Sequence, residues 1–321
     1  MTERRRSGRI KRDELLHDVR IGFAKPQKEL SPKYFYDERG SELFEEITRL
    51  PEYYPTEAER RILRECAPEF VRETELCTLV ELGAGSANKT RIILDAMRDT
   101  GFGRTYIPVD VSADFLDGVA EQLRIEYPSL EILPAVADIT ADFALPRTVP
   151  PTVVAFLGST IGNFGRDETI DLLSRCAKLL GPRDRFLLGC DLRKPVEIVE
   201  AAYNDSRGIT AEFNLNMLRV VNNELGANFD LTAFRHRAFY NQDLHRIEMH
   251  LVSTKAQTVT IPGIGGVEFR EGESIHTEVS YKYNREAIEN LFHPAGLVLD
   301  KWMTDSSRMF ALAVGRSKFA K

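Results

Sequence analysis

Acidic residues and glycines in the first half of the chain are spaced as a cofactor site requires. Glu81 lies within residues 78–82, a run of β-branched and large apolar side chains, and Gly83 and Gly85 follow at once. The run predicts a parallel strand buried on both faces, and the glycines predict a sharp turn that a ligand can approach closely. From Lys89 the apolar residues recur at helical spacing. Strand, glycine turn and helix together form a unit that binds nucleotides and nucleotide-like cofactors.

Two common kinds of cofactor do not fit this turn. A dinucleotide fingerprint has a third glycine where the helix begins, and a phosphate-binding P-loop has a glycine directly before its Lys-Thr pair. Asn88 stands at that position, just before Lys89 and Thr90. A carboxylate at Glu81 would repel a pyrophosphate but suits a cofactor with positive charge. S-adenosylmethionine, which carries a sulfonium and an α-ammonium group, is such a cofactor.

Two further acids support this interpretation. Residues 105–109 predict the next strand, with Asp110 at its carboxyl end, and residues 129–133 predict a third strand, followed by Asp138. Ligands of open α/β sheets lie outside the carboxyl ends of the strands, where an acid can accept hydrogen bonds from ribose hydroxyls. We therefore expect Asp110 to bind the ribose and Asp138 to bind the adenine amino group. Either acid alone would be more simply a capping or solvated residue.

The composition is that of an ordinary globular protein. The 321 residues are 43% hydrophobic and 29% charged, which allows one large domain or two ordinary ones. The net charge of −6 does not suit a protein that coats nucleic acid or an anionic membrane. No stretch reaches the roughly 18 consecutive apolar residues of a membrane span. We therefore expect neither nucleic acid nor a membrane as partner.

The cysteines and the amino-terminal residues give expectations about the cellular compartment. Cys66, Cys77, Cys176 and Cys190 stand far apart, with no Cys-x-x-Cys pair, which argues against a structural zinc site and for a reducing compartment such as the cytoplasm. Residues 1–12 are basic and lack the apolar run of a signal peptide. We expect a flexible terminus there, with a nucleic-acid-binding arm as the alternative.

The remaining pattern predicts two domains. Strands at 152–157 and 185–190 with a helix at 168–180 continue the alternation of a parallel, doubly wound sheet. After this come predicted helices at 195–203 and 211–223, period-two strands at 234–240, 246–253, 257–261 and 275–283, and a closing unit of helix 285–292 with strands 296–302 and 309–314. We predict an α/β fold, a Rossmann-like doubly wound sheet with a second, discontinuous α+β domain.

The domain limits follow from this division. Residues 58–192 and 284–321 are expected to bind the cofactor, and residues 13–57 and 193–283 are expected to bind the substrate. Residues 158–164 follow a predicted strand at its carboxyl end, where the Asn163 amide could hold a carboxylate or an amine. The alternative is a simple βα loop with turn glycines and a capping Asn.

Five segments in chain order resemble the histidine-specific methyltransferases of ergothioneine biosynthesis. They are Tyr34-Phe35-Tyr36-Asp37, Leu50-Pro51-Glu52-Tyr53-Tyr54-Pro55-Thr56, Glu81-Leu82-Gly83-Ala84-Gly85, Gly158-Ser159-Thr160-Ile161-Gly162-Asn163 and Thr277-Glu278-Val279-Ser280. The resemblance runs from about residue 18 to the carboxyl end. It implies a class I methyltransferase that uses S-adenosylmethionine to trimethylate the α-amine of free L-histidine, which gives hercynine.

The resemblance also implies roles for individual residues. The residues that would line the cofactor are Tyr36, Gly83, Lys89, Asp110, Asp138 and Ile139. The residues that would line the histidine pocket are Tyr53, Gly158, Asn163, Tyr203, Met249, Glu278 and Ser280. Asn163 and Tyr203 would hold the backbone groups of the amino acid, and Glu278 and Ser280 would hold its imidazole. Ile139 departs from the family pattern, in which an aromatic residue is common beside adenine.

Elementary chemistry agrees with these roles and leaves some alternatives open. Glu278 and Ser280 are two apart on a predicted strand, so they share a face and together can bind a two-nitrogen ring. Without the resemblance, Glu278 would be simply a solvated edge-strand acid, and Met249 a core residue. Tyr36 and Asn163 are the expected catalytic residues, with Tyr36 orienting the α-amine, and we assign no general base.

Other expectations concern metals and the competing functions. His245, His250 and His276 are scattered singly without a clear acid partner, so we expect no metal site. The main alternative function is a methyltransferase of the same build that acts on another amino acid or small amine. A catalytically silent cofactor-binding protein and a nicotinamide oxidoreductase are the remaining alternatives. The sequence does not determine the oligomeric state, and our expectation is a monomer.

Overall fold

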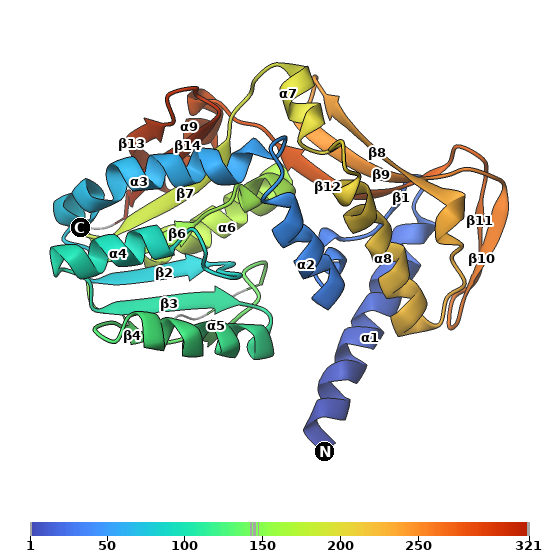
Figure 1. The fold of residues 1–321 in the computed structure, drawn as a ribbon, viewed down its shortest axis with the longest axis horizontal. Coiled ribbons are helices and arrows are strands. Elements are labelled where there is room, and N and C mark those ends of the chain that lie inside the picture. Colours follow the sequence, from blue (N-terminus) through green and yellow to red (C-terminus); the bar gives the residue numbers. More distant parts are fainter. Residues whose placement is uncertain (1, 142, 144–145, 147, 320–321) are drawn as a thin grey trace. The chain divides into compact units, whose positions relative to one another are not determined.

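The computed structural model describes residues 2–319 except 142, 144, 145 and 147. The chain divides into two compact units. The first unit comprises Met1–Tyr54 and Lys194–Ser280, and the second comprises Pro55–Arg193 and Tyr281–Lys321. Each unit contains a β-sheet (Figure 1). Each also has a buried apolar core.

A sheet of eight strands forms the centre of the second unit. Its order is β13-β14-β7-β6-β2-β3-β4, with β5 paired to β3. The strands are β2 (Thr78–Leu82), β3 (Thr105–Asp110), β4 (Glu131–Ile132), β5 (Ala135–Val136), β6 (Thr152–Phe156), β7 (Arg185–Asp191), β13 (Leu297–Thr304) and β14 (Phe310–Ser317). Pairing is parallel from β7 to β4 and antiparallel at β14 and β13.

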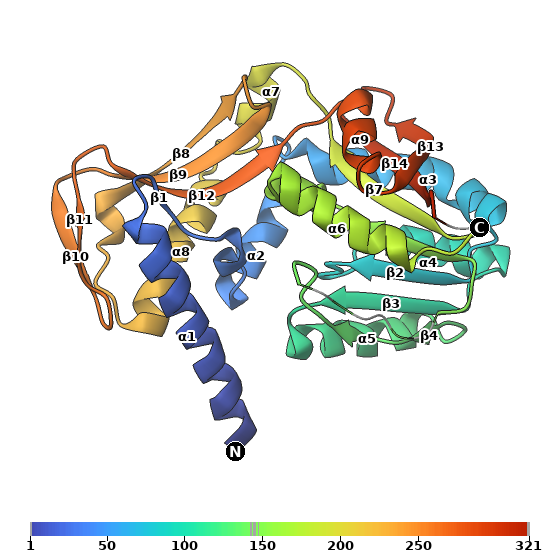
Figure 2. The same ribbon diagram turned by 180° about the vertical axis from the view of Figure 1, so that it is seen from behind.

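Helices cover both faces of this sheet (Figures 1 and 2). They are α3 (Tyr54–Thr74), α4 (Arg91–Thr100), α5 (Ala113–Glu126), α6 (Arg166–Leu179) and α9 (Arg285–Phe292). Leu79 packs in a cluster with apolar residues of α3, α4 and α5, whereas its neighbour Val80 packs with those of α6 and α9. Successive strand residues point to opposite faces, which explains why residues 78–82 are apolar almost without interruption. The predicted doubly wound α/β sheet is confirmed.

The first unit is built on a sheet of four strands in the order β1-β12-β9-β8. Its strands are β1 (Lys28–Glu29), β8 (Phe234–Asn241), β9 (Arg246–Ser253) and β12 (Ser274–Tyr281), with a separate hairpin of β10 (Gln257–Ile261) and β11 (Gly265–Phe269). Its helices are α1 (Thr2–Ala24), α2 (Glu38–Ile47), α7 (Val196–Ala201) and α8 (Ile209–Leu225). Phe35 stacks on Phe213 of α8 at a centroid distance of 4.5 Å within the core of this unit.

Helix α1 begins at Thr2, and its residues Leu15, Val19 and Phe23 are buried. The flexibility expected of residues 1–12 stays a prediction. Two strands differ from the sequence expectation. Strand β11 was not predicted, because Gly265 and Gly266 at its start are poor strand formers. The predicted strand at 129–133 is only the two-residue β4.

Among the residues that the structure describes, no helix is both long enough and apolar enough to cross a membrane.

Candidate active site

The glycine turn after β2 lies against the carboxyl end of β3. The backbone amide of Gly83 donates a hydrogen bond to the carbonyl of Val109 (2.8 Å), and Gly85 N donates to Asp110 Oδ2 (3.2 Å). Gly83 and Gly85 have φ angles of 65° and 50°, in the left-handed region that glycine tolerates best. No heavy atom outside the immediate chain neighbours lies within 4 Å of the point where a Gly85 Cβ would stand. The turn therefore leaves room for a ligand beside a half-buried carboxylate.

Glu81 supports this turn from within the protein. Glu81 is 3% exposed, and its carboxylate accepts hydrogen bonds from the hydroxyls of Thr90 and Tyr106. These bonds link β2 to β3 and to the residue that precedes α4. Desolvation raises the pKa of Glu81 to about 7. We therefore correct the expectation that the Glu81 charge faces the cofactor, since its oxygens are bonded inside the protein.

A buried carboxylate that was not among the predicted site residues lies on α3. Glu59 is fully buried, forms an ion pair with Lys89, and accepts hydrogen bonds from Gly158 N at 2.9 and 3.1 Å. The pattern Thr56-x-x-Glu59 resembles a capping box, but α3 begins at Tyr54. Glu59 instead stands on the buried face of α3 beside Ala58 and Ile62. An acid at an otherwise apolar helical position was the signal that could have identified it.

Two glycines provide the space that this ion pair needs. A Cβ at Gly189 would lie 2.1 Å from Glu59 Oε1, and a Cβ at Gly158 would lie 2.9 Å from Lys89 Nζ. Gly158 also has a φ of 79°, which side chains other than glycine rarely adopt. The predicted site residues Lys89 and Gly158 are thus brought together through Glu59.

The loop that carries Asn163 is held by buried polar contacts. Asn163 ends the 3₁₀ helix η2 (Thr160–Asn163) and is half-buried. The amide of Asp191 donates to Ser159 Oγ (2.9 Å), and the Tyr283 hydroxyl donates to the Ile161 carbonyl (3.3 Å). Asp191 also forms an ion pair with Lys282 at 2.9 Å, with both side chains 1% exposed. These contacts fix the loop backbone just before Asn163.

Asp138 and Ile139 follow β5 in the second unit. Asp138 is exposed, and its Oδ1 accepts hydrogen bonds from the Thr140 amide (2.8 Å) and hydroxyl (2.6 Å). Ile139 is half-buried against the apolar cluster of α6 and α9. Its carbonyl accepts a hydrogen bond from Arg175 at 3.0 Å. Both residues follow β5, and Val136 of β5 pairs with Asp110 at the end of β3.

The other predicted site residues belong to the first unit, where the three tyrosines among them make aromatic contacts. Tyr36 contacts Phe44 edge to face at 5.6 Å, Phe44 contacts Tyr53 at 6.3 Å, and Tyr53 contacts Tyr203 at 6.3 Å between centroids. The Tyr203 hydroxyl donates a hydrogen bond of 2.8 Å to Ser280 Oγ. Tyr36, Tyr53, Tyr203 and Ser280 therefore belong to one connected set.

The charge of Glu278 acts on Tyr36, a member of this set. Tyr36 is 46% exposed as a residue. Even so, desolvation of its phenol and the charge of Glu278 raise the Tyr36 pKa above its usual range. The phenol therefore stays protonated at neutral pH and can orient a polar group by hydrogen bonding. It does not act as a base under these conditions.

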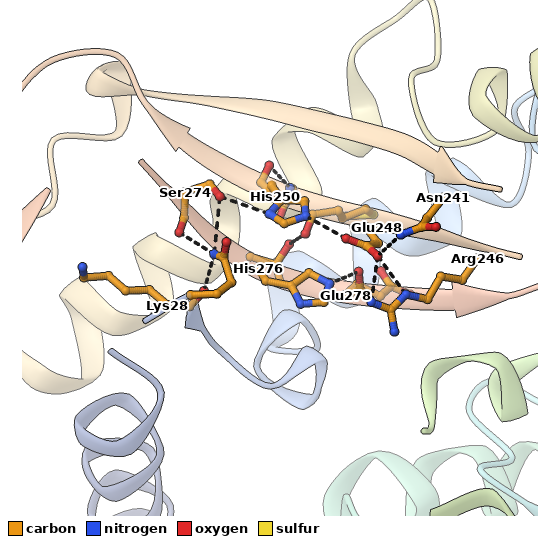
Figure 3. A network of polar contacts seen from close by, with 12 residues as sticks. Lys28, Asn241, Arg246, Glu248, His250, Ser274, His276 and Glu278 are labelled. Carbon is orange, nitrogen blue, oxygen red and sulfur yellow. Dashed lines mark hydrogen bonds and ion pairs between the residues drawn. The ribbon is translucent and has the colours of Figure 1, made fainter. Parts of the chain in front are cut away.

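Met249 and two of the histidines lie on the strands of the first unit. Met249 is 1% exposed and lies in the core with Ile247 and Leu251, as the simpler interpretation held. His250 and His276 are not scattered: their rings stack at a centroid distance of 4.7 Å, and His250 lies beside Glu248 (Figure 3). The expectation that these histidines lack an acid partner is wrong, because Glu248 lies two residues before His250 on β9. Pairing of β9 with β12 adds His276, which is distant in sequence.

The fold and the carboxyl-end residues define a class of protein. A doubly wound parallel sheet with an open glycine turn after β2 and an acid at the end of β3 is the arrangement of an S-adenosylmethionine-dependent methyltransferase. The family model described as "Histidine-specific methyltransferase, SAM-dependent" matches residues 15–317. The chain belongs to this family, and it is an enzyme that uses S-adenosylmethionine. The resemblance noted from the sequence is thereby confirmed.

Individual relatives agree with the family match. A histidine N-alpha-methyltransferase of Mycolicibacterium smegmatis is 44% identical over 303 residues, which are 94% of each chain. The protein of the same description from Mycobacterium tuberculosis is 42% identical over 302 residues, again 94% of each chain. Ergothioneine biosynthesis protein 1 of Neurospora crassa is 31% identical over 290 residues, which are 84% of this chain and 31% of that protein.

Replacement of Glu59 tests the role of the buried ion pair. Glu59→Gln leaves the Lys89 charge without its partner, and we expect the free energy of unfolding to fall by about 3 kcal/mol. We also expect weaker S-adenosylmethionine binding, measured by calorimetry. Glu57→Gln is the matched control, because Glu57 is an exposed acid on the same helix and should change stability by less than about 0.5 kcal/mol. Equal effects of the two substitutions would contradict the assignment.

Replacement of Glu81 gives a prediction about pH. Desolvation raises the Glu81 pKa from 4.5 to about 7, so the protonated carboxyl is favoured in the folded chain. Its contribution to stability is greatest below the unfolded pKa and is lost as the pH rises through the folded pKa. We therefore expect the free energy of unfolding of the wild type, measured in urea, to fall relative to that of Glu81→Gln as the pH rises from 4.5 to about 7. The expected fall is on the order of 3 kcal/mol. A difference between the two proteins that is independent of pH would exclude this account.

Proposed function

We propose that the protein transfers three methyl groups from S-adenosylmethionine to the α-amine of free L-histidine and so forms hercynine, the first step of ergothioneine biosynthesis. The observation that carries this proposal is the match of the histidine-specific family over residues 15–317. The curated relatives that cover nearly the whole chain are described as histidine N-alpha-methyltransferases. The contacts of Ser280 and Tyr203 in the first unit give the proposal a chemical basis.

S-adenosylmethionine would be held largely by the second unit. The open turn at Gly83 gives the cofactor access to the backbone, and Asp110 beside it can accept hydrogen bonds from ribose hydroxyls. Asp138 would accept a hydrogen bond from the adenine amino group, and Ile139 would pack against the adenine. Lys89, held by Glu59, and Tyr36 complete the proposed cofactor set. When bound, the cofactor supplies an electrophilic methyl group.

The histidine side chain would be recognised by Glu278 and Ser280 of β12. A carboxylate next to an imidazole accepts its N–H, and a hydroxyl can serve the second ring nitrogen. An analogue without the N–H would leave the carboxylate unpaired, which is how a polar site rejects similar molecules. Met249 and Tyr53 would supply apolar surface, and Gly158 would let the substrate approach the backbone.

The reaction itself needs a neutral amine in line with the methyl group, and positioning supplies much of the rate. We propose that Asn163 and Tyr203 hold the carboxylate and amine of the substrate. Tyr36 would accept an N–H of the amine through its hydroxyl oxygen. The raised pKa of Tyr36 agrees with this role, since a protonated phenol orients the amine without removing its proton.

The position of the added methyl groups tests the proposed reaction. The purified protein is incubated with S-adenosylmethionine and L-histidine, and the product is analysed by mass spectrometry and NMR. We expect three methyl groups on the α-nitrogen and none on the ring. Methylation of a ring nitrogen would overturn the proposed orientation of the substrate.

We propose further that the protein acts in the cytoplasm as a monomer. In support, Cys66, Cys77, Cys176 and Cys190 form no disulfide, as expected of a reducing compartment. Light scattering coupled to size-exclusion chromatography tests the oligomeric state. A mass of two chains, maintained on dilution, would contradict the monomer.

Removal of the Glu278 carboxylate tests the proposed histidine site. Glu278→Ala removes a hydrogen bond to a charged group, so we expect the Kd or KM for histidine to rise by about tenfold to a hundredfold. S-adenosylmethionine binding should change by less than about twofold by the same calorimetry, because the loss is confined to imidazole recognition. Glu271→Ala, at an exposed acid of the first unit, is the control. Equal losses of affinity for both ligands would argue against the role of Glu278.

A further inference from the structure

Three side chains with metal-binding atoms meet on the sheet of the first unit. Glu248 and His250 are two apart on β9 and therefore point to the same face, and His276 lies on the neighbouring strand β12 (Figure 3). Their potential ligand atoms all lie within 4.8 Å of one another. This face is the opposite of the one that carries Ile247 and Met249, since strand residues alternate.

The distances are close to those of a metal site. Ligand atoms bound about 2.0 to 2.1 Å from a tetrahedral zinc ion stand about 3.4 Å apart. Glu248 Oε2 and His250 Nε2 are 3.4 Å apart. The His276 ring stacks on His250 at 4.7 Å with an angle of 20° between the planes, so its side-chain torsions must adjust for the third ligand atom to converge.

In each of the three side chains, the polar atom that faces away from the cluster already has a hydrogen-bond partner. Glu248 Oε1 accepts hydrogen bonds from Arg246 (2.7 and 2.9 Å) and from Asn241 (3.0 Å). His250 Nδ1 lies 3.2 Å from Ser274 Oγ, and His276 Nε2 lies 3.1 Å from the Glu278 carbonyl oxygen. Metal-binding histidines and carboxylates typically have such partners on the atom that does not bind the metal. The pattern leaves Glu248 Oε2, His250 Nε2 and His276 Nδ1 as the ligand atoms.

Burial and charge are also suitable. Glu248 and His250 are 9% and 8% exposed, so the cluster is largely shielded from water. The Arg246 charge opposes a cation, but its two hydrogen bonds to Glu248 are on the oxygen that points away from His250.

We propose that Glu248, His250 and His276 form a binding site for zinc or a similar divalent transition metal, with one position open to water. Two imidazoles and a carboxylate are a ligand set that zinc accepts. The bound ion would join β9 to β12, the strand that carries Glu278 and Ser280, and would stabilise the first unit. It plays no part in the methyl transfer and does not depend on the identity of the substrate.

Cobalt binding tests the proposal directly. The chelator-treated protein is titrated with Co²⁺ and followed by visible absorption, and then with Zn²⁺. We expect one equivalent of Co²⁺ to bind with the strong d–d bands of a tetrahedral site, Zn²⁺ to displace it, and Zn²⁺ to raise the Tm. A wild type without these bands would overturn the proposal. A thiolate charge-transfer band would overturn it as well, because it would place the ion at a cysteine.

Matched variants locate the ion. His276→Phe keeps a ring that can stack on His250 but removes one ligand, and we expect its affinity for Co²⁺ to fall at least tenfold. Ser274→Ala removes the hydroxyl that contacts His250 and that also accepts a long hydrogen bond from Gln27 (3.4 Å), but it keeps all three ligands, so it should weaken binding by a smaller factor. It tests the site even if His276→Phe does not fold. His293→Phe, at an exposed histidine of the second unit, should bind as the wild type does. Unchanged affinity in both His276→Phe and Ser274→Ala would contradict the site.

Discussion

The ion pair of Glu59 and Lys89 constrains much of the second unit. A buried carboxylate is stable only when a counter-charge and hydrogen bonds compensate for its lost hydration. Lys89 supplies the charge, and the amide of Gly158 supplies the hydrogen bonds. The same requirement explains why residues 158 and 189 are glycines, since a Cβ at either position would collide with the pair. One electrostatic contact thus connects helix α3, the residues before α4 and the loop after β6.

In the first unit, aromatic contacts and paired polar groups hold the proposed substrate residues. Two of its proposed substrate residues, Tyr53 and Tyr203, are aromatic rings in edge-to-face contact, and the Tyr203 hydroxyl is paired with Ser280. Aromatic contacts of this kind restrict orientation, while a buried polar pair is costly to disrupt. Such a surface is suited to a small, flat, polar ring. Tyr36 adds a hydroxyl group, and its raised pKa keeps this group protonated at neutral pH.

The sequence predicted the sheet of the second unit more fully than it predicted the site. Apolar runs and turns have a local signal, so β2 and α9 were predicted to the residue. The contact of Glu59 with Lys89 joins residues 30 positions apart, and the local pattern suggested a helix cap instead. The stack of His250 and His276 depends on the pairing of β9 with β12, which no local spacing encodes. The resemblance to a known family, rather than periodicity, indicated Tyr203, Met249 and Glu278 as site residues.

The substrate is the central claim, and competition among amino acids tests it most directly. The protein is incubated with S-adenosylmethionine and an equimolar mixture of the standard amino acids, and added methyl groups are detected by mass spectrometry. We expect trimethylated histidine and no other methylated product. Preferential methylation of a different amino acid would leave the fold and the cofactor unchanged but would contradict the assignment of Glu278 and Ser280 to imidazole recognition.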